Sequence, residues 1–422
     1  MRPAQVAVVA WLCAAGVAAC AACAKEAPST SGAPSVESKS ETKGSAPPAA
    51  LSKISTTSPE IALGNLDAQI DSRRAMLARN ADDAAAAHAL VDLLLARGEY
   101  ASRIADYEDA DARAAAFLDA HPASADAHLA RASTLGVFHR FDAELAELDA
   151  ASRLHAPAEA VDSARRAVLM ARAQFDEAAA LGAGTDPALL DPMGLATLAV
   201  LAAERGAPAE SDAVFERARA KYRDVSPFPL AWMDFQRGSL LERRGDRARA
   251  RLYFEEAHAA LPGFAHPAVH LAGLVEPAAG LAMLAPLVDQ TDDPQVAAAY
   301  ADALRRVGRG EEAKAPTERA RAGYERLVQR HPEAFADHAA QFYLGLGHDP
   351  SRALALARRN AENRATEPAL DLWMTAALVA GERGEACAAA ARGATVRYAS
   401  STFQSLVETT RAGCTAVAAR AP

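Results

Sequence analysis

The sequence contains one pair of histidines at the spacing of two metal ligands on a helix. His266 and His270 are four residues apart, and His258 and Glu255 lie shortly before them. Pro267 directly follows His266, which indicates that this histidine lies at a helix entrance rather than on a formed helix face. We therefore expect surface or packing histidines here and predict no metal site.

Other signatures of chemistry are weak. The segments Gly182-Ala183-Gly184 and Gly345-Leu346-Gly347 lack the third glycine and the preceding strand of a dinucleotide-binding loop. No segment has the His-Glu-x-x-His pattern of a metal-binding helix or the Gly-x-Ser-x-Gly pattern of a nucleophile elbow. The sequence therefore predicts no catalytic residues, no cofactor and no enzymatic activity.

The composition indicates a helical protein. Of the 422 residues, 111 are alanine, the residue with the highest helix propensity, and only 5% are aromatic. β-Sandwiches and barrels need β-branched and aromatic residues on their pleated faces, so this composition disfavours them. With 51% hydrophobic residues the chain can bury a core, which argues against wholesale disorder. The predicted fold class is all-α.

The charge balance argues against nucleic acid as a partner. The chain has 45 lysines and arginines against 54 aspartates and glutamates, a formal net charge of −9. Such a chain provides no broad positive field for a phosphate backbone.

Residues 1–20 have the features of a bacterial export signal. Arg2 is followed by an apolar stretch and then by Val17-Ala18-Ala19-Cys20. The last four residues resemble a lipoprotein lipobox, which implies that Cys20 is acylated and becomes the first residue of the mature chain. The alternative is a plain signal peptide cut near Ala22-Cys23-Ala24, or an uncleaved anchor helix. If Cys20 carries lipid, Ala21 after it favours the outer membrane, with the folded part facing the periplasm or the cell surface.

Residues 21–57 follow the signal and have the composition of a tether. Serine, threonine, proline, alanine and glycine dominate this segment without any hydrophobic period. Such a segment cannot bury enough apolar surface to offset the entropy of ordering, so we expect it to be disordered.

A repeat signature occupies the middle of the body, between Ala231 and Pro262. Small, aromatic and proline residues occur there at the spacing G-x6-G-x4-A-x3-F-x2-A-x4-P, namely Gly238, Gly245, Ala250, Phe254, Ala257 and Pro262. This spacing resembles the tetratricopeptide repeat, a helix-turn-helix unit of about 34 residues. The resemblance implies that Gly238 and Ala250 lie where two helices cross and that Gly245 ends the first helix. The implied fold is a right-handed α-α superhelical solenoid of tetratricopeptide-like helix pairs.

The same frame recurs along the chain with losses and predicts about nine repeats in residues 58–422. The turns between paired helices are expected near Gly98, Arg140, Ala173, Gly206, Gly245, Ala278, Gly308, Asp349 and Gly384. Ser58-Pro59 predicts a capping helix to about Arg79, because proline is favoured at the first helical position. A second capping helix is expected over 400–419, since the ends of a repeat array must be covered.

Cys387 and Cys414 lie in the last repeat and in the second capping helix. An exported protein permits a disulfide between them, and closing a loop of that length is worth roughly 3.5 kcal/mol in the chain-entropy model. The alternative is two buried thiols whose Cα atoms are too far apart to be bridged.

The concave groove of such an array predicts the partner-binding residues. In a chain this poor in aromatic residues, Phe228, Trp232 and Phe235 are the candidate anchors, with Ser239 and Arg305 at further groove positions. The alternative is that these aromatic residues only pack the core between repeats. The expected function is a non-catalytic, lipid-anchored scaffold that binds a protein or peptide of the cell envelope. A periplasmic binding module for a small molecule or an envelope polymer is the second hypothesis.

Overall fold

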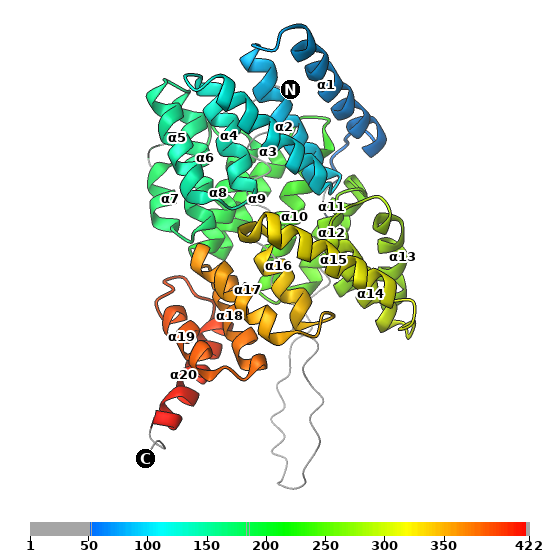
Figure 1. Cartoon of the computed structure of the whole chain (residues 1–422), viewed down its shortest axis with the longest axis vertical. Coiled ribbons are helices and arrows are strands. Elements are labelled where there is room, and N and C mark those ends of the chain that lie inside the picture. Colours follow the sequence, from blue (N-terminus) through cyan, green and yellow to red (C-terminus); the bar gives the residue numbers. More distant parts are fainter. Residues whose placement is uncertain (1–50, 52, 183, 185, 419–422) are drawn as a thin grey trace.

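The computed structural model describes residues 51, 53–182, 184 and 186–418 (Figure 1). Those residues form twenty α-helices and no strand. The helices are α1 (Pro59–Arg79), α2 (Ala84–Tyr100), α3 (Ile104–Ala120), α4 (Ala125–Val137), α5 (Phe141–Arg153), α6 (Ala158–Ala171), α7 (Phe175–Leu181), α8 (Pro192–Glu204), α9 (Pro208–Lys221), α10 (Pro227–Arg243), α11 (Arg247–Ala260), α12 (Ala265–Leu274), α13 (Pro277–Val288), α14 (Pro294–Arg306), α15 (Lys314–Arg330), α16 (Pro332–Leu344), α17 (Pro350–Asn363), α18 (Glu367–Ala380), α19 (Arg383–Gly393) and α20 (Ser401–Ala418).

Consecutive helices form nine hairpin-like pairs, from α2/α3 to α18/α19, while α1 and α20 cover the two ends of the array. This confirms the predicted fold class, an all-α superhelical solenoid of tetratricopeptide-like helix pairs. The number of pairs agrees with the expected nine repeats. No helix in the described part of the chain is both long and apolar enough to cross a membrane.

The signature residues pack as the repeat resemblance implied. A Cβ atom on Gly238 would lie only 2.7 Å from Cε1 of Phe254, so the close crossing of α10 and α11 requires a glycine there. Ala250, Phe254 and Ala257 of α11 are fully buried. At the start of the array, the Ser58 hydroxyl accepts a hydrogen bond from the Ile61 amide and Pro59 opens α1, as predicted.

The turns inside most pairs share one geometry. One residue takes a positive φ, and the next amide donates to a carbonyl five residues earlier, which satisfies the end of the first helix. In the α10–α11 turn, Gly245 has a φ of 80° and the Asp246 amide donates to the Leu241 carbonyl at 3.0 Å. Ser102, His139 and Ala173 take the positive-φ position in other pairs, although none of them is a glycine. His348 also has a positive φ, but the Asp349 amide after it donates to a carbonyl six residues earlier.

Three predicted turn positions were wrong. Gly98 lies inside α2, where a Cβ would lie 2.5 Å from the Tyr107 ring, so it is a packing glycine rather than a turn residue. Gly384 lies inside α19, and Gly381 takes the left-handed conformation instead, with a φ of 76°. Ala278 lies inside α13, because the turn before that helix is Val275–Glu276.

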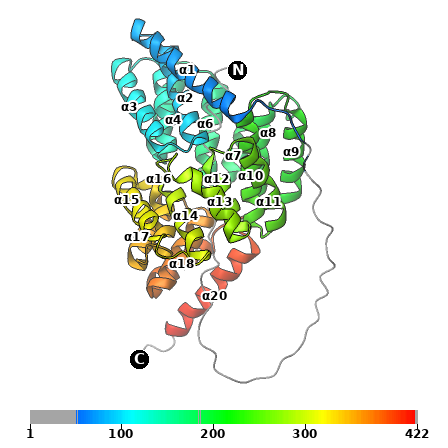
Figure 2. The same ribbon diagram turned by 90° about the vertical axis from the view of Figure 1, so that its right-hand side faces the viewer.

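The superhelix winds far enough for its second turn, α12–α20, to pack beneath its first turn, α2–α11. Figure 2 shows α15 and α16 below α3 and α4. The contacts between the two turns are made by the α2–α3, α4–α5 and α6–α7 hairpins of the first turn, and we call this set of contacts the seam. Repeat arrays are usually held together by neighbouring repeats alone, so a seam adds long-range contacts that most solenoids lack.

The α2–α3 hairpin makes the first seam contact. The carboxylate of Asp292 accepts hydrogen bonds from the amides of Ile104 (2.6 Å) and Ala105 (2.9 Å) at the start of α3. The Ser102 hydroxyl accepts from the Ala265 amide at 2.8 Å, and the Thr291 hydroxyl donates to the Ser102 carbonyl. Ser102 therefore holds its positive φ while buried between two superhelical turns.

The next two hairpins make similar contacts. In the α4–α5 turn, His139 lies near the Glu333 carbonyl, and Asn363 donates to the His139 carbonyl at 3.1 Å. In the α6–α7 hairpin, the Asp176 carboxylate accepts from the Tyr398 hydroxyl at 2.7 Å and pairs with Arg397. The seam thus joins residues that lie more than 160 positions apart in the chain.

The packed body begins before residue 58, which corrects the predicted end of the tether. Leu51 and Ile54 are half-buried against the main hydrophobic core. The Thr57 amide and hydroxyl both donate to the Val225 carbonyl, at 2.7 and 3.2 Å, because the loop before α10 offers an unpaired acceptor. The expected export signal (1–20), with Cys20, and the first part of the expected tether lie outside the described residues.

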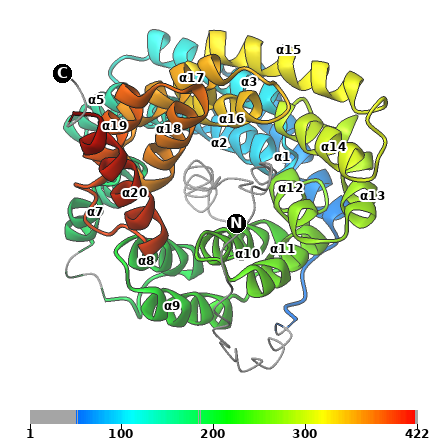
Figure 3. The ribbon, with the colours of Figure 1, turned by 90° about the horizontal axis from the view of Figure 1, so that it is seen from below.

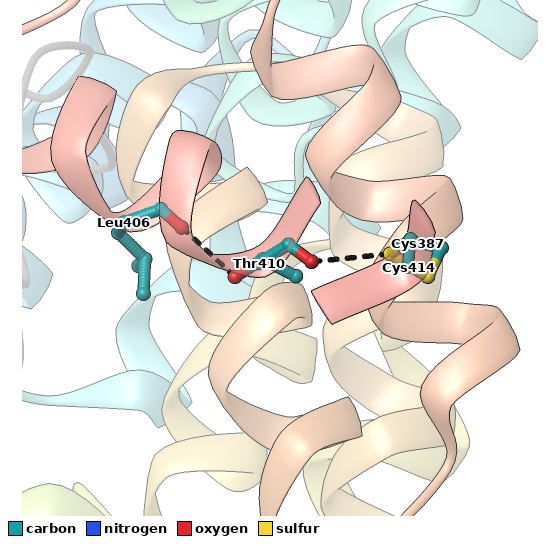
Figure 4. Close-up of a disulfide and its surroundings, with 4 residues drawn as sticks. All are labelled: Cys387, Leu406, Thr410 and Cys414. Carbon is teal, nitrogen blue, oxygen red and sulfur yellow. Dashed lines mark hydrogen bonds between the residues drawn. A yellow bond between two sulfur atoms is a disulfide. The ribbon is translucent and has the colours of Figure 1, made fainter. Parts of the chain in front are cut away.

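A disulfide joins α19 to α20, as predicted. Cys387 and Cys414 are bonded, with their Cα atoms 6.0 Å apart (Figure 4). Along α20 the Thr410 hydroxyl donates to the Leu406 carbonyl at 2.8 Å, while Phe403 and Val407 lie against Gly393 of α19. The cap at this end is therefore both packed and covalently fixed.

Candidate functional site

The first helix of each pair lies toward the superhelix axis and the second lies outside it, as Figure 3 shows for α8, α10, α12, α16 and α18. We call the first helices the inner layer. Helices of the inner layer also contact one another: α2 contacts α4, and α16 contacts α18. The groove predicted to bind a partner should be found on this layer.

The strongest predicted anchors lie in α10, in the core. Residues 230–241 of this helix are all buried, and Trp232 is 0% and Phe235 2% exposed. The Phe235 ring contacts those of Phe264 and His270, with centroids 5.4 and 5.6 Å apart, and so packs one helix pair against the next. Ser239 is also buried and donates to the Phe235 carbonyl. As exposed partner contacts these three predictions were wrong, and the core-packing alternative is the one that burial supports.

The other two predicted residues lie apart from each other. The half-buried Phe228 ring is stacked on Tyr100 of α2 with centroids 4.7 Å apart, so α2 covers it. Arg305, near the end of α14, is exposed. The five predicted partner-binding residues therefore do not form one accessible surface.

A polar cluster on α2 and α4 was only partly apparent from the sequence. His88 lies 3.7 Å from Asp92 and 3.5 Å from Asp126. Burial raises the pKa of Asp92 to about 6, although the His88 imidazole opposes the shift. For His88, burial alone would lower the pKa, but the two carboxylates outweigh it and raise the pKa. The spacing of His88 and Asp92 places them on one helix face, whereas the approach of Asp126 depends on the packing of two helices.

The histidines at metal-ligand spacing have other contacts. His270 is hydrogen-bonded to Glu242 at 2.6 Å, and its ring lies 5.0 Å from that of Phe254. His266 packs beside Phe235 and Phe264. Nowhere in the described ranges do three histidine, cysteine, aspartate or glutamate side chains come together as a metal site would require.

Several buried charged groups have structural explanations. Arg219 forms an ion pair with Asp234, and both are buried. The Arg237 guanidinium lies 4.5 Å from the Tyr253 ring centroid and 5.8 Å from that of Phe215. These groups bind α9, α10 and α11 together through charge-assisted and cation–π contacts.

Glu144 of α5 is an exception. Its side chain is fully buried, neither carboxyl oxygen has a hydrogen-bond partner, and burial raises its pKa to about 10. The helical period places Glu144 on the buried face of α5 with Phe141, Leu148 and Ala151, a signal that the sequence prediction did not use. Because it has no access to solvent, its perturbed pKa does not by itself indicate a catalytic acid.

The largest exposed apolar side chains are few. In the described part of the chain they are Ile61, Leu189, Val225, Leu378 and Val379. Leu378 (48% exposed) and Val379 (56% exposed) are adjacent and lie near the end of α18, in the inner layer. The sequence prediction did not include them, because their exposure depends on how the neighbouring helices pack.

Comparisons with known proteins point to no family. No protein-family model and no curated protein matches the chain. Among solved structures, the Cut9–Hcn1 hetero-tetramer of the APC/C is similar with 13% identity and a TM-score of 0.41, covering 82% of this chain and 73% of that chain. Yeast Tom70 is similar with 13% identity and a TM-score of 0.36, covering 86% and 96%. The TPR domain of P58(IPK) is similar with 13% identity and a TM-score of 0.28, covering 83% and 94%. These weak likenesses carry no information on what this chain binds.

Proposed function

We propose that this protein is a non-catalytic binding scaffold of the bacterial envelope, held at the outer membrane by lipid on Cys20, that engages a protein or peptide partner. The observation that carries partner binding is the exposed apolar pair Leu378 and Val379 on the inner layer. Adjacent exposed aliphatic residues are costly in water and are a feature of interaction sites. The Cys387–Cys414 disulfide supports export, because such bonds persist in oxidising compartments.

The seam supports a scaffold function for a mechanical reason. A linear array bends easily, but the contacts of Ser102, His139 and Asp176 with the second superhelical turn hold this array in one shape. A partner bound at the end of α18 then meets a preorganised surface, which lowers the entropic cost of binding.

The partner site can be tested with a matched pair of variants. Leu378→Ser/Val379→Ser should abolish capture of the partner from envelope extracts by the immobilised protein. Leu189→Ser is the control, because Leu189 is 81% exposed but lies in the loop before α8. Equal capture by wild type and the double variant would overturn the proposed site. Loss of capture by the control alone would move the site to that loop.

The anchor has a separate test. Wild-type protein should carry the mass of a lipid modification and partition into detergent, and Cys20→Ala should do neither. Cys23→Ala is the control, since Cys23 lies beside the lipobox-like segment but outside it. Identical behaviour of wild type and Cys20→Ala would refute lipid anchoring.

A further inference from the structure

Two histidines lie at the seam, where the α4–α5 hairpin meets the loop between α15 and α16. The His331 ring is stacked on Phe138 with centroids 3.8 Å apart. Its Nδ1 is 3.2 Å from an Arg140 Nη atom, and its Nε2 is 3.2 Å from a Glu108 carboxylate oxygen. Arg330 also contacts Glu108, at 2.8 Å. Each of these contacts joins residues of different superhelical turns.

The donors and acceptors around His331 determine its protonation state. An arginine side chain can only donate hydrogen bonds, so Nδ1 of His331 must accept from Arg140. The ring is therefore neutral, with its proton on Nε2 and donated to Glu108. Adding a second proton would place an N–H against the Arg140 guanidinium and lose that hydrogen bond. Burial, Arg140 and Arg330 together lower the His331 pKa, while Glu108 opposes the shift.

His139 is the second seam histidine. It is only 4% exposed, and its Nδ1 lies 3.2 Å from the Glu333 carbonyl oxygen. Burial and the Arg364 guanidinium lower its pKa to about 3, although the Asp337 carboxylate opposes this and His338 adds to it slightly. Arg364 and Asp337 form a buried ion pair of their own, so Asp337 is not free to stabilise a protonated His139.

We propose that this part of the seam is an acid-sensitive latch, in which protonation of His331 and His139 separates the α4–α5 hairpin from the second superhelical turn. Both rings are neutral in the closed seam, and both regain the ordinary histidine affinity for protons once the seam opens. The proposal does not rest on the proposed scaffold function.

The sign and size of the effect follow from proton linkage. Because the closed form binds fewer protons than the open form, closure is favoured at neutral pH and weakens as the pH falls below the ordinary histidine pKa of about 6.5. For each unit by which the pH falls, each histidine raises the ratio of open to closed protein by up to about tenfold, and the two histidines together raise it by up to about a hundredfold.

Two substitutions remove the titration but keep the hydrogen bonds. In His331→Gln the amide oxygen can accept from Arg140 while the amide nitrogen donates to Glu108. In His139→Asn the amide nitrogen can donate to the Glu333 carbonyl, and asparagine tolerates the positive φ of 54° at this position. His258→Gln is the control, because His258 is half-buried with a pKa lowered by burial but lies in α11, away from the seam.

Hydrogen exchange followed by mass spectrometry between pH 7 and 5, corrected for intrinsic exchange rates, tests the latch. Wild type and His258→Gln should lose at least tenfold protection in peptides covering 134–141 and 331–338 as the pH falls. The double variant His139→Asn/His331→Gln should keep that protection. Unchanged protection in wild type at pH 5, or an equal loss in the double variant, would overturn the proposal.

A second measurement is needed if the two substitutions themselves open the seam at pH 7. Nuclear magnetic resonance titration of the wild-type protein with labelled histidine, assigned with the single variant His331→Gln, reports on His331 directly. If the latch is correct, the pKa of His331 lies below the ordinary histidine value, and the seam opens over the same pH range in which His331 gains its proton. An ordinary histidine pKa for His331 while the seam stays closed would overturn the proposal.

Discussion

Asp292 caps the start of α3 at Ile104, although the two residues are 188 positions apart in the chain. Arg103, the residue at the helix N-cap, makes no side-chain capping bond. A helix start leaves several amides unsatisfied, and here the second superhelical turn supplies the acceptor that the local sequence lacks. The negative charge of Asp292 also lies where the helix dipole favours it. One carboxylate thus couples the stability of α3 to the folding of the second turn.

Replacement of Asp292 should therefore destabilise the protein from a distance. We expect Asp292→Ala to lower the free energy of unfolding by about 1 to 2 kcal/mol, the usual effect of losing a helix cap. Urea unfolding followed by circular dichroism measures the change. Asp289→Ala is the control, because Asp289 is exposed and only pairs with Arg319. An equal effect of the two variants would argue against capping across the seam.

The helix pairs were predictable from the sequence because their determinants are local. Gly238, Ala250 and Phe254 fix one crossing through contacts within a single pair, and Ser58 with Pro59 begins α1 by local capping. The errors at Gly98 and Gly384 have a common cause, since in these two pairs a nearby glycine was taken as the turn residue. The sequence gives no sign that a serine or a histidine takes the left-handed conformation when distant residues hold it there.

The functional residues were harder to predict because burial on the inner layer depends on the superhelix as a whole. Trp232 and Phe235 have the residue types of interface anchors, but helix pairs before and after α10 bury them. The seam itself depends on residues more than 160 positions apart, and no pattern within one repeat records such contacts. The pairing of Cys387 with Cys414 was predictable because a terminal helix must return to the pair that it covers.

Reduction of the disulfide should weaken the C-terminal cap. The chain-entropy model gives a loss of about 3 to 4 kcal/mol for the 27-residue separation of Cys387 and Cys414. We expect Cys387→Ser to show this loss in urea unfolding, with increased hydrogen exchange in α20. Reducing agent should bring wild type to the level of the variant and leave the variant unchanged. A fall in stability of the variant on reduction would show that another disulfide contributes.

Glu144 should make the protein less stable as the pH rises. Its folded pKa of about 10 lies above the unfolded value of 4.5, so the folded state holds a proton that the unfolded state releases. The pH-dependent cost of burying this carboxyl group is therefore absent at low pH and grows as the pH rises from 4.5 toward 10. At pH 7 this amounts to about 3 kcal/mol.

Glu144→Gln tests this expectation because glutamine has nearly the same shape and does not ionise. The variant should be about 2 to 3 kcal/mol more stable than wild type at pH 7, and the difference should shrink toward pH 4.5. Chemical unfolding at several pH values gives both results. Asp142→Asn is the control on the same helix, since the Asp142 side chain is 90% exposed. A difference between wild type and Glu144→Gln that does not vary with pH would contradict a buried, protonated carboxyl group.

Trp232 and Phe235 distinguish a core function from a partner-binding function. Both side chains are buried, so Trp232→Ala and Phe235→Ala should each lower the free energy of unfolding by about 3 to 5 kcal/mol, as large-to-small core substitutions do. A residue used only for partner contact would change stability little when truncated. Arg305→Ala is the comparison, because Arg305 is exposed and should stay within about 0.5 kcal/mol of wild type. Reduced partner capture by Trp232→Ala or Phe235→Ala at unchanged stability would restore these two residues as partner contacts and contradict their placement in the core.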